Sequence, residues 1–249
     1  LSRERPKDYT GDWQKLSAGS THILLRRTAY DWVHEADARI AIQRMDQAPM
    51  RPRPSAEEIA ANLKRLAEFT EHHVARSINQ ADLFRKQVPA NTFGFITFDG
   101  GGALVQKYLI APFDLNPGEA LILETEVPEK CRYWSFQMND YNWAALDWRT
   151  SQASLNGFTA KRDKDGKFRA VVSAEDPGVP NWLDTLKNKR GIIQGRWREC
   201  SSTPLPVLTK VNVADVRRHL PADTPVVTPR ARDEAIRLRD QGAQFRRQW

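Results

Sequence analysis

The feature that most constrains the fold is a series of short segments with alternating apolar and polar residues over residues 93–198. This period of two is typical of β-strands, because successive side chains of a strand point to opposite faces of a sheet. Turn signals separate the segments about every ten residues, a spacing typical of an antiparallel β-sandwich or jelly roll. Strands are predicted at residues 93–98, 103–111, 120–127, 132–140, 153–160, 168–173 and 191–197.

Two of these segments carry further information. Residues 132–140 have bulky side chains on both faces, which predicts a strand that is covered on both sides. The glycine run 99–102 lies between two strands and predicts a hairpin turn. No Lys-Ser or Lys-Thr pair and no helix follow these glycines, so they do not form a phosphate-binding P-loop.

A long helix is predicted to precede the sandwich. Ser55 with Glu58 three residues later forms a capping box, which marks a helix start. An apolar stripe follows at helical spacing, and the helix is expected to end near His73 or Ser77, with a second helical piece over 79–87. The stripe consists of Ile59, Leu63, Leu66, Phe69 and Val74.

The ends of the chain are less regular. Residues 1–20 are polar and predict an arm, and residues 21–32 and 38–45 predict two strands of a hairpin, with a helix over 29–45 as the alternative. Residues 201–208 are expected to be irregular and 213–220 to form a short helix. Residues 230–249 have helical propensity but few apolar residues, so this helix needs a docking surface or a partner subunit.

These patterns predict a mainly β protein with α-helices. The core is expected to be a jelly-roll-like antiparallel β-sandwich, with one long helix at about 55–77 and a helical C-terminal tail. Residues 1–92 would form the arm, hairpin and capped helix that pack on the core, residues 93–200 the sandwich, and residues 201–249 an extended segment and the last helix.

Composition excludes several classes of protein. The net charge is +7, but basic and acidic residues are interleaved, which disfavours nucleic-acid binding. The sequence lacks an apolar run long enough to span a membrane and a recognisable leader, so a cytoplasmic location is expected. No metal or cofactor motif is present, and His72 and His73 face different directions on a helix. Cys131 and Cys200 are predicted to be buried free thiols, with a single bridge as the open alternative.

Two clusters contain residue types suited to a binding or catalytic site. The first lies in residues 132–150, where carboxylates stand beside tryptophans, whose apolar surface raises a carboxyl pKa. The second lies in residues 176–197. The structural alternative for both clusters is core tryptophans with turn-forming aspartates and asparagines. The candidate acid–base residues are Asp140, Asp147, Asp176 and Asp184. The candidate substrate-binding residues are Trp134, Asn139, Tyr141, Trp143, Trp148, Arg149, Asn181, Trp182 and Arg196.

Residues 117–156, the Asp-Gly pair at 165–166, the segment 176-DPGVPNWLD-184 and the Gly-Arg-Trp at 195–197 together resemble the DUF1214 family of uncharacterised bacterial domains. The resemblance covers about residues 105–200 and implies a jelly-roll-like β domain. It implies no agreed reaction, so it assigns no catalytic residue. A DUF1254 domain, which often accompanies this family, is not evident in the sequence.

The sequence leaves open whether the chain is an enzyme, and it favours one. The expected activity is that of a cofactor-independent hydrolase or lyase, which acts on a small apolar or aromatic molecule by carboxylate acid–base chemistry. Arginine in these clusters can bind an anionic group of the ligand. The alternatives are a non-catalytic β-sandwich that binds carbohydrate or another ligand, and a structural or oligomerisation protein. A small-molecule substrate and a homo-oligomer are expected, with no nucleic-acid or membrane partner.

Overall fold

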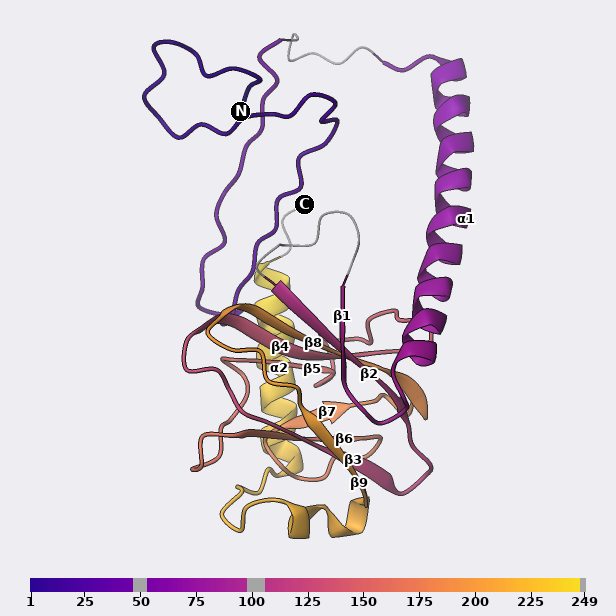
Figure 1. Cartoon of the computed structure of the whole chain (residues 1–249), viewed down its shortest axis with the longest axis vertical. Helices are drawn as coiled ribbons and strands as arrows, with labels where there is room; N and C mark the ends of the chain where they lie inside the picture. The colour runs from indigo at the N-terminus through magenta and orange to yellow at the C-terminus, as the bar shows by residue number, and fades with distance from the viewer. Residues whose placement is uncertain (47–52, 98–105, 247–249) are drawn as a thin grey trace.

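The computed structural model describes residues 1–46, 53–97 and 106–246. It contains two β-sheets that face each other (Figure 1). The five-stranded sheet has the order β1-β2-β8-β4-β5, formed by β1 (Gly94–Ile96), β2 (Gln106–Asp114), β4 (Cys131–Asn139), β5 (Ser154–Asn156) and β8 (Arg190–Cys200). The four-stranded sheet has the order β7-β6-β3-β9, formed by β3 (Glu119–Thr125), β6 (Phe168–Ser173), β7 (Trp182–Asp184) and β9 (Val207–Asn212). All pairs of strands are antiparallel except β6 and β7.

The main hydrophobic core lies between the two sheets. Trp134 and Phe136 of β4 and Trp197 of β8 pack against Leu123 of β3 and Phe168 of β6. Burial of side chains of this size contributes roughly 1.5–3 kcal/mol each relative to exposure. The predicted antiparallel β-sandwich is therefore confirmed.

Several predicted strands differ in detail. The turn at 99–102 and the start of the strand at 103–111 lie outside the described residues. The strand predicted at 153–160 ends at Asn156, whose side chain accepts from the Thr159 amide and turns the chain. Strand β7 forms where no strand was predicted, and β9 begins within the segment 201–208 that was expected to be irregular.

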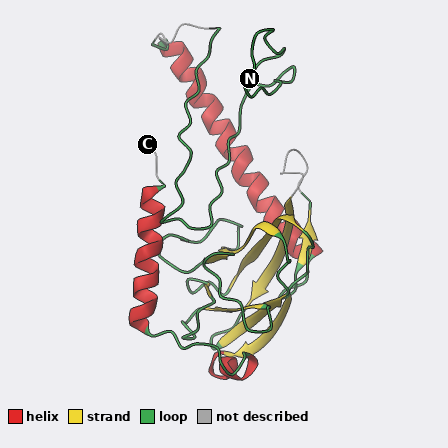
Figure 2. Ribbon diagram, turned by 90° about the vertical axis from the view of Figure 1, so that its left-hand side faces the viewer, coloured by secondary structure: helices red, strands yellow, loops and turns green. Residues whose placement is uncertain are grey.

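The long helix α1 (Ala56–Gln87) begins as predicted, because the Ser55 side chain accepts from the Glu58 amide and the Glu58 carboxylate accepts from the Ser55 amide. It does not end at residue 77. No helix-breaking residue separates the two predicted pieces, which form one continuous helix. Only Ala81 and Phe84, near its end, are buried, and the N-terminal half of the helix stands clear of the sandwich (Figure 2).

The hairpin predicted over residues 21–45 is not formed, and no β-ladder occurs in this segment. Two extended stretches run away from the sandwich instead (Figure 1). Their apolar side chains Ile23, Leu24, Ile40 and Ile42 are exposed. Alternation alone predicted strands here, but a strand also needs a partner that supplies its backbone hydrogen bonds.

The C-terminal part wraps back onto the sandwich. The segment predicted to be a short helix forms the 3₁₀-helix η1 (Val213–His219), and the final helix α2 (Pro229–Phe245) starts at Thr228, which caps the Ala231 amide. Helix α2 docks on the domain, as its sparse apolar content required (Figure 2).

The two cysteines are bridged rather than free. Cys131 and Cys200 lie directly opposite each other at the ends of β4 and β8, and they form a disulfide. The prediction of two free thiols is wrong. The two cysteines are 69 residues apart in the sequence, and only the pairing of β4 with β8 brings them together. The bridge that the sequence left open is formed.

Candidate functional site

The outer face of the five-stranded sheet is polar. Alternation along β4 sends Trp134 and Phe136 into the core, and it sends Tyr133, Ser135 and Gln137 to the opposite face. Both faces are covered, as predicted for this strand. The outward side chains form the floor of a cavity rather than an exposed sheet surface.

Strand register brings polar residues from distant parts of the sequence into one row. Arg196 of β8 lies opposite Tyr108 of β2 on one side and Ser135 of β4 on the other. Gln194 likewise lies opposite Gln137. On the core face of β8, a Cβ at Gly195 would come within 2.9 Å of the Phe136 ring. The absence of a side chain there lets Phe136 pack directly beneath the floor.

Above this floor lies a cavity of about 1360 Å³. Its walls come from the segment 25–37, the loop 142–148 and helix α2, with part of α1 at the rim. Trp32, Trp143 and Trp148 line it beside the polar floor. Ligand pockets commonly combine apolar walls with a few fixed polar groups, and they measure roughly 300–1,000 Å³. This cavity has room for a small molecule and accompanying water.

The charge of the cavity is strongly unbalanced. Its described lining includes one carboxylate, Asp37, which is already ion-paired with Arg27 at 3.2 Å and Arg246 at 2.6 Å. Seven arginines line the same space: Arg26, Arg27, Arg76, Arg196, Arg198, Arg239 and Arg246.

Arg196 rises from the middle of the floor. Its Nη1 donates a long hydrogen bond of 3.4 Å to Gln137, and its guanidinium lies 5.8 Å from the centre of the Tyr108 ring. Among the described residues it makes no ion pair. Burial lowers the pKa of Arg196, the neighbouring tyrosines Tyr133 and Tyr108 oppose this shift, and the positive charge of Arg26 adds to it. The buried Ser135 hydroxyl, one strand away, also lacks a hydrogen-bond partner in the described part of the chain.

Arg239 reaches the cavity from α2. It donates to the Trp148 carbonyl at 3.2 Å and to the Ser154 hydroxyl and carbonyl at 3.0 and 2.7 Å. These acceptors are neutral, and no described carboxylate pairs with it. Burial, together with a smaller effect of the charge of Arg232, lowers the pKa of Arg239 to about 10. Arg239 therefore remains a cation at neutral pH, and it is held by these neutral acceptors and by the Trp32 ring, whose centre lies 5.2 Å from the guanidinium.

A row of arginines holds α2 in place. Arg232, Arg239 and Arg246 are spaced by seven residues, which is nearly two turns at about 3.6 residues per turn, so they lie on one face of the helix axis. Arg232 pairs with Asp176 at 2.8 Å and also donates to Gln152 and to the Val179 carbonyl. Arg246 continues the row beyond the last helical residue and joins the segment 31–37.

The match to a known family includes much of the cavity floor and the wall loop 142–148, but not the N-terminal segment or α2. Residues 112–196 match the family model described as "Protein of unknown function (DUF1214)". This segment is similar to the DUF1214 family. The resemblance predicted from the sequence is thereby confirmed over this range, which is called the DUF1214 segment below.

One solved structure shares the fold over a large part of the chain. It is an uncharacterised protein from Burkholderia cenocepacia with 27% identity and a TM-score of 0.62, and the match covers 69% of this chain and 48% of that one. The chain thus spans about half the length of that protein. The VPA0106 protein from Vibrio parahaemolyticus matches at 18% identity and a TM-score of 0.33, over 44% of this chain and 32% of its own. Comparison with curated proteins gave no match.

The DUF1214 segment contains the four candidate acid–base residues, and none of them lines the cavity. Asp140 accepts from the Asn142 and Ala144 amides and closes a turn. Asp147 accepts from the Arg149 and Thr150 amides. The hydrogen bond from the Thr150 hydroxyl is the main cause of the lowered pKa of Asp147.

The other two aspartates lie beneath α2. Asp176 pairs with Arg232, and Asp184 accepts from the Leu186 amide at 2.7 Å. Burial raises the pKa of Asp184, with a smaller contribution from the charge of Asp176. The structure brings these two together and keeps Asp140 and Asp147 apart from the arginine-lined cavity. A catalytic role for the four remains a prediction.

The candidate binding residues divide in the same way. Asn139, Trp143, Trp148 and Arg196 line the cavity. The other five lie elsewhere: Trp134 in the core, Tyr141 stacked under Arg85, Arg149 paired with Asp240, Asn181 bonded to the backbone of Lys161 and Arg169, and Trp182 under the Arg232 guanidinium.

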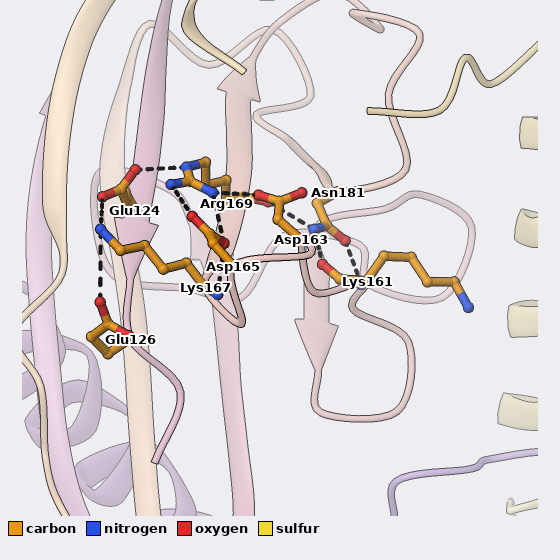
Figure 3. Close-up of polar contacts among 8 residues, drawn as sticks. All are labelled: Glu124, Glu126, Lys161, Asp163, Asp165, Lys167, Arg169 and Asn181. Carbon is orange, nitrogen blue, oxygen red and sulfur yellow. Dashed lines mark hydrogen bonds and ion pairs between the residues drawn. The ribbon is translucent and has the colours of Figure 1, made fainter. Parts of the chain in front are cut away.

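A second polar cluster surrounds Asn181 and the hairpin 163–167 (Figure 3). Arg169 pairs with Glu124 at 2.6 Å, Asp163 at 2.7 Å and Asp165 at 2.8 Å, and these carboxylates raise its pKa. The Asn181 side chain accepts from the Lys161 amide and donates to two carbonyls. Arg169, Lys167 and the carboxylates around them are all paired, so the cluster fixes the hairpin to the sheet.

Sequence reasoning missed the residues that give the cavity its charge. Arg26 and Arg239 lie outside the DUF1214 segment, and both looked like surface charges. The seven-residue spacing on α2 was the available signal for Arg239. The described residues contain no group of three or more side chains suited to a metal ion. Within the same residues, no helix has the length and apolar character needed to cross a membrane.

Proposed function

We propose that this protein binds a small molecule with an anionic group in the arginine-lined cavity. The observation that carries the proposal is Arg196, a partly buried guanidinium on the cavity floor with no carboxylate partner among the described residues. Burying an uncompensated charge is unfavourable, and an anionic ligand would offset that cost. The planar guanidinium also suits the two oxygens of a carboxylate.

The test uses the full chain and benzoate as a simple carboxylate probe, titrated by calorimetry at constant ionic strength. Arg196→Met keeps the length and apolar stem of the side chain and removes its charge. Because a hydrogen bond to a charged group contributes about 1.5–3 kcal/mol, affinity is expected to fall about 10–100-fold.

The matched control is Arg190→Met, on the same strand. Arg190 is exposed, pairs with Asp114 at 2.9 Å and does not line the cavity. Its substitution should leave the affinity within about twofold of the unmodified protein. Equal benzoate affinity in the Arg196→Met variant and the unmodified protein would refute a role for this cavity.

Hydrolase or lyase activity remains a separate proposal. Asp184 supports it, since a carboxyl group with a raised pKa suits general acid catalysis. Its position beneath α2, outside the cavity lining, favours ligand binding without turnover. Absence of product from a bound ligand, with unchanged binding in Asp184→Asn, would remove the catalytic proposal and leave the binding site.

The remaining expectations about partners are untested. A homo-oligomer stays a prediction, to be measured by the molar mass in solution. The cytoplasmic location also stays a prediction. The Cys131–Cys200 disulfide argues for an oxidising compartment, where such bonds usually persist.

A further inference from the structure

The N-terminal segment is tied to the cavity floor at two points. Thr28 accepts from Nη1 of Arg198 at 3.1 Å, and the Tyr30 hydroxyl accepts from the Trp134 amide at 2.9 Å. Asn156 also donates to the Tyr30 carbonyl at 3.0 Å. These bonds place the residues just before Thr28 along the rim, where Arg26 lines the cavity.

Arg26 and Arg196 are like charges that act on each other across this space. The charge of Arg26 lowers the pKa of Arg196, in addition to the larger effect of burial. Neither arginine has an ion pair among the residues that the structure describes. The only described carboxylate of the lining, Asp37, is occupied by two other arginines. Two cations that share a site repel each other unless an anion lies between them.

The surrounding groups fit an oxyanion with an apolar body. Tyr108 lies opposite Arg196 on β2 and makes a side-chain hydrogen bond with it, and Tyr133 lies on β4 opposite Arg198. A phenol group can donate a hydrogen bond as well as accept one. The cavity is far larger than an inorganic anion needs. Its walls include Trp32 and Trp148, whose rings meet edge to face with centres 5.1 Å apart, and these present aromatic surface to a ligand.

We propose that Arg26 and Arg196 together clamp the carboxylate of an aromatic acid whose ring packs against Trp32 and Trp148. The inference rests on the proposed function and makes it specific. It also makes the N-terminal segment part of the site, so that the DUF1214 segment alone supplies only one of the two guanidinium groups.

The clamp is tested by benzoate calorimetry on the full chain with Arg26→Met. Arg26 is exposed at the cavity rim, so the substitution leaves the core intact. Affinity is expected to fall at least about tenfold, similar to Arg196→Met. The control is Arg39→Met, an exposed residue of the same N-terminal region that does not line the cavity, and it should change affinity less than about twofold.

The aromatic part is tested by comparing benzoate with acetate. The unmodified protein should bind benzoate more tightly than acetate, and Trp148→Ala should lower the affinity for benzoate more than the affinity for acetate. Equal effects on both acids would overturn the assignment of the ring. Unchanged affinity in Arg26→Met with a loss in Arg196→Met would overturn the clamp but leave the binding function. The clamp and the binding function would both be overturned if benzoate did not bind at about 10 mM, or if neither arginine variant lost benzoate affinity.

Discussion

Replacing Arg232 tests how a helix with little apolar surface is held on the sandwich. Its side chain is 8% exposed and joins α2 to four groups, the Asp176 carboxylate, the Gln152 side chain, the Val179 carbonyl and the Pro180 carbonyl, the last of which also accepts from Gln152. Arg232→Met keeps most of the volume and removes all of these donors. Two neutral acceptors are then buried without a partner, at a cost of about 1–3 kcal/mol each.

The carboxylate adds less to the expected loss. Asp176 is 31% exposed, so water can solvate it when the guanidinium is removed, and its share should be about 1 kcal/mol or below. We therefore expect Arg232→Met to lower the free energy of unfolding by about 3–5 kcal/mol, within the range measured for breaking one side of a buried pair.

Urea unfolding followed by circular dichroism measures this change. The control is Arg230→Met, two residues earlier, where an exposed pair with Glu234 should contribute about 0.3–0.5 kcal/mol. If the Arg232→Met and Arg230→Met variants unfold at the same urea concentration, α2 is not held by its arginines. A lowered slope in the Arg232→Met variant would show that α2 detaches before the sandwich unfolds.

Three further predictions concern stability. Asp184→Asn should raise the free energy of unfolding at pH 7, because the raised pKa of Asp184 in the folded state makes its ionised form unfavourable there. The gain in stability should disappear as the pH falls from that raised pKa to the ordinary value near 3.8. A gain that persists below this range would contradict the assignment. Cys200→Ser should lower the free energy of unfolding by about 2–4 kcal/mol, since the bridge to Cys131 closes a long loop, and a reductant should destabilise only the unmodified protein in urea titrations. Asn181→Ala should lower the melting temperature far more than Asn142→Ala, because the buried Asn181 side chain bonds three backbone groups, whereas Asn142 is exposed. Equal shifts in the two variants would refute this.

The sequence predicted those features that depend on neighbouring residues. The alternation of Trp134 and Phe136 with polar residues gave the strand and its two faces. Ser55 and Glu58 gave the start of α1, because a capping box is complete within four residues. The aspartates among the tryptophans were also recognised as turn formers in the structural alternative, and Asp140 makes such a turn.

Features that depend on strand register were not predictable in this way. Tyr108, Ser135 and Arg196 meet in one row only because β8 pairs with both β2 and β4. The same pairing joins the two cysteines. A local pattern cannot supply register between strands some 60 residues apart, since hydrophobic alternation fixes the face of a strand but not its partner. The hydrophobic residues of segment 21–45 show the converse, a strand pattern without a sheet to complete it.

The residues that line the cavity come partly from the DUF1214 segment and partly from the rest of the chain. The DUF1214 segment supplies Ser135, Gln137 and Arg196, which form much of the floor. Arg26 and Arg239 come from segments on either side of it, and they decide which groups face that floor. Loops and terminal segments vary more readily than the strands that support them. If the proposed clamp binds an aromatic acid, its second guanidinium comes from Arg26, outside the DUF1214 segment, so the specificity of the proposed site depends on the N-terminal segment as well as on the floor.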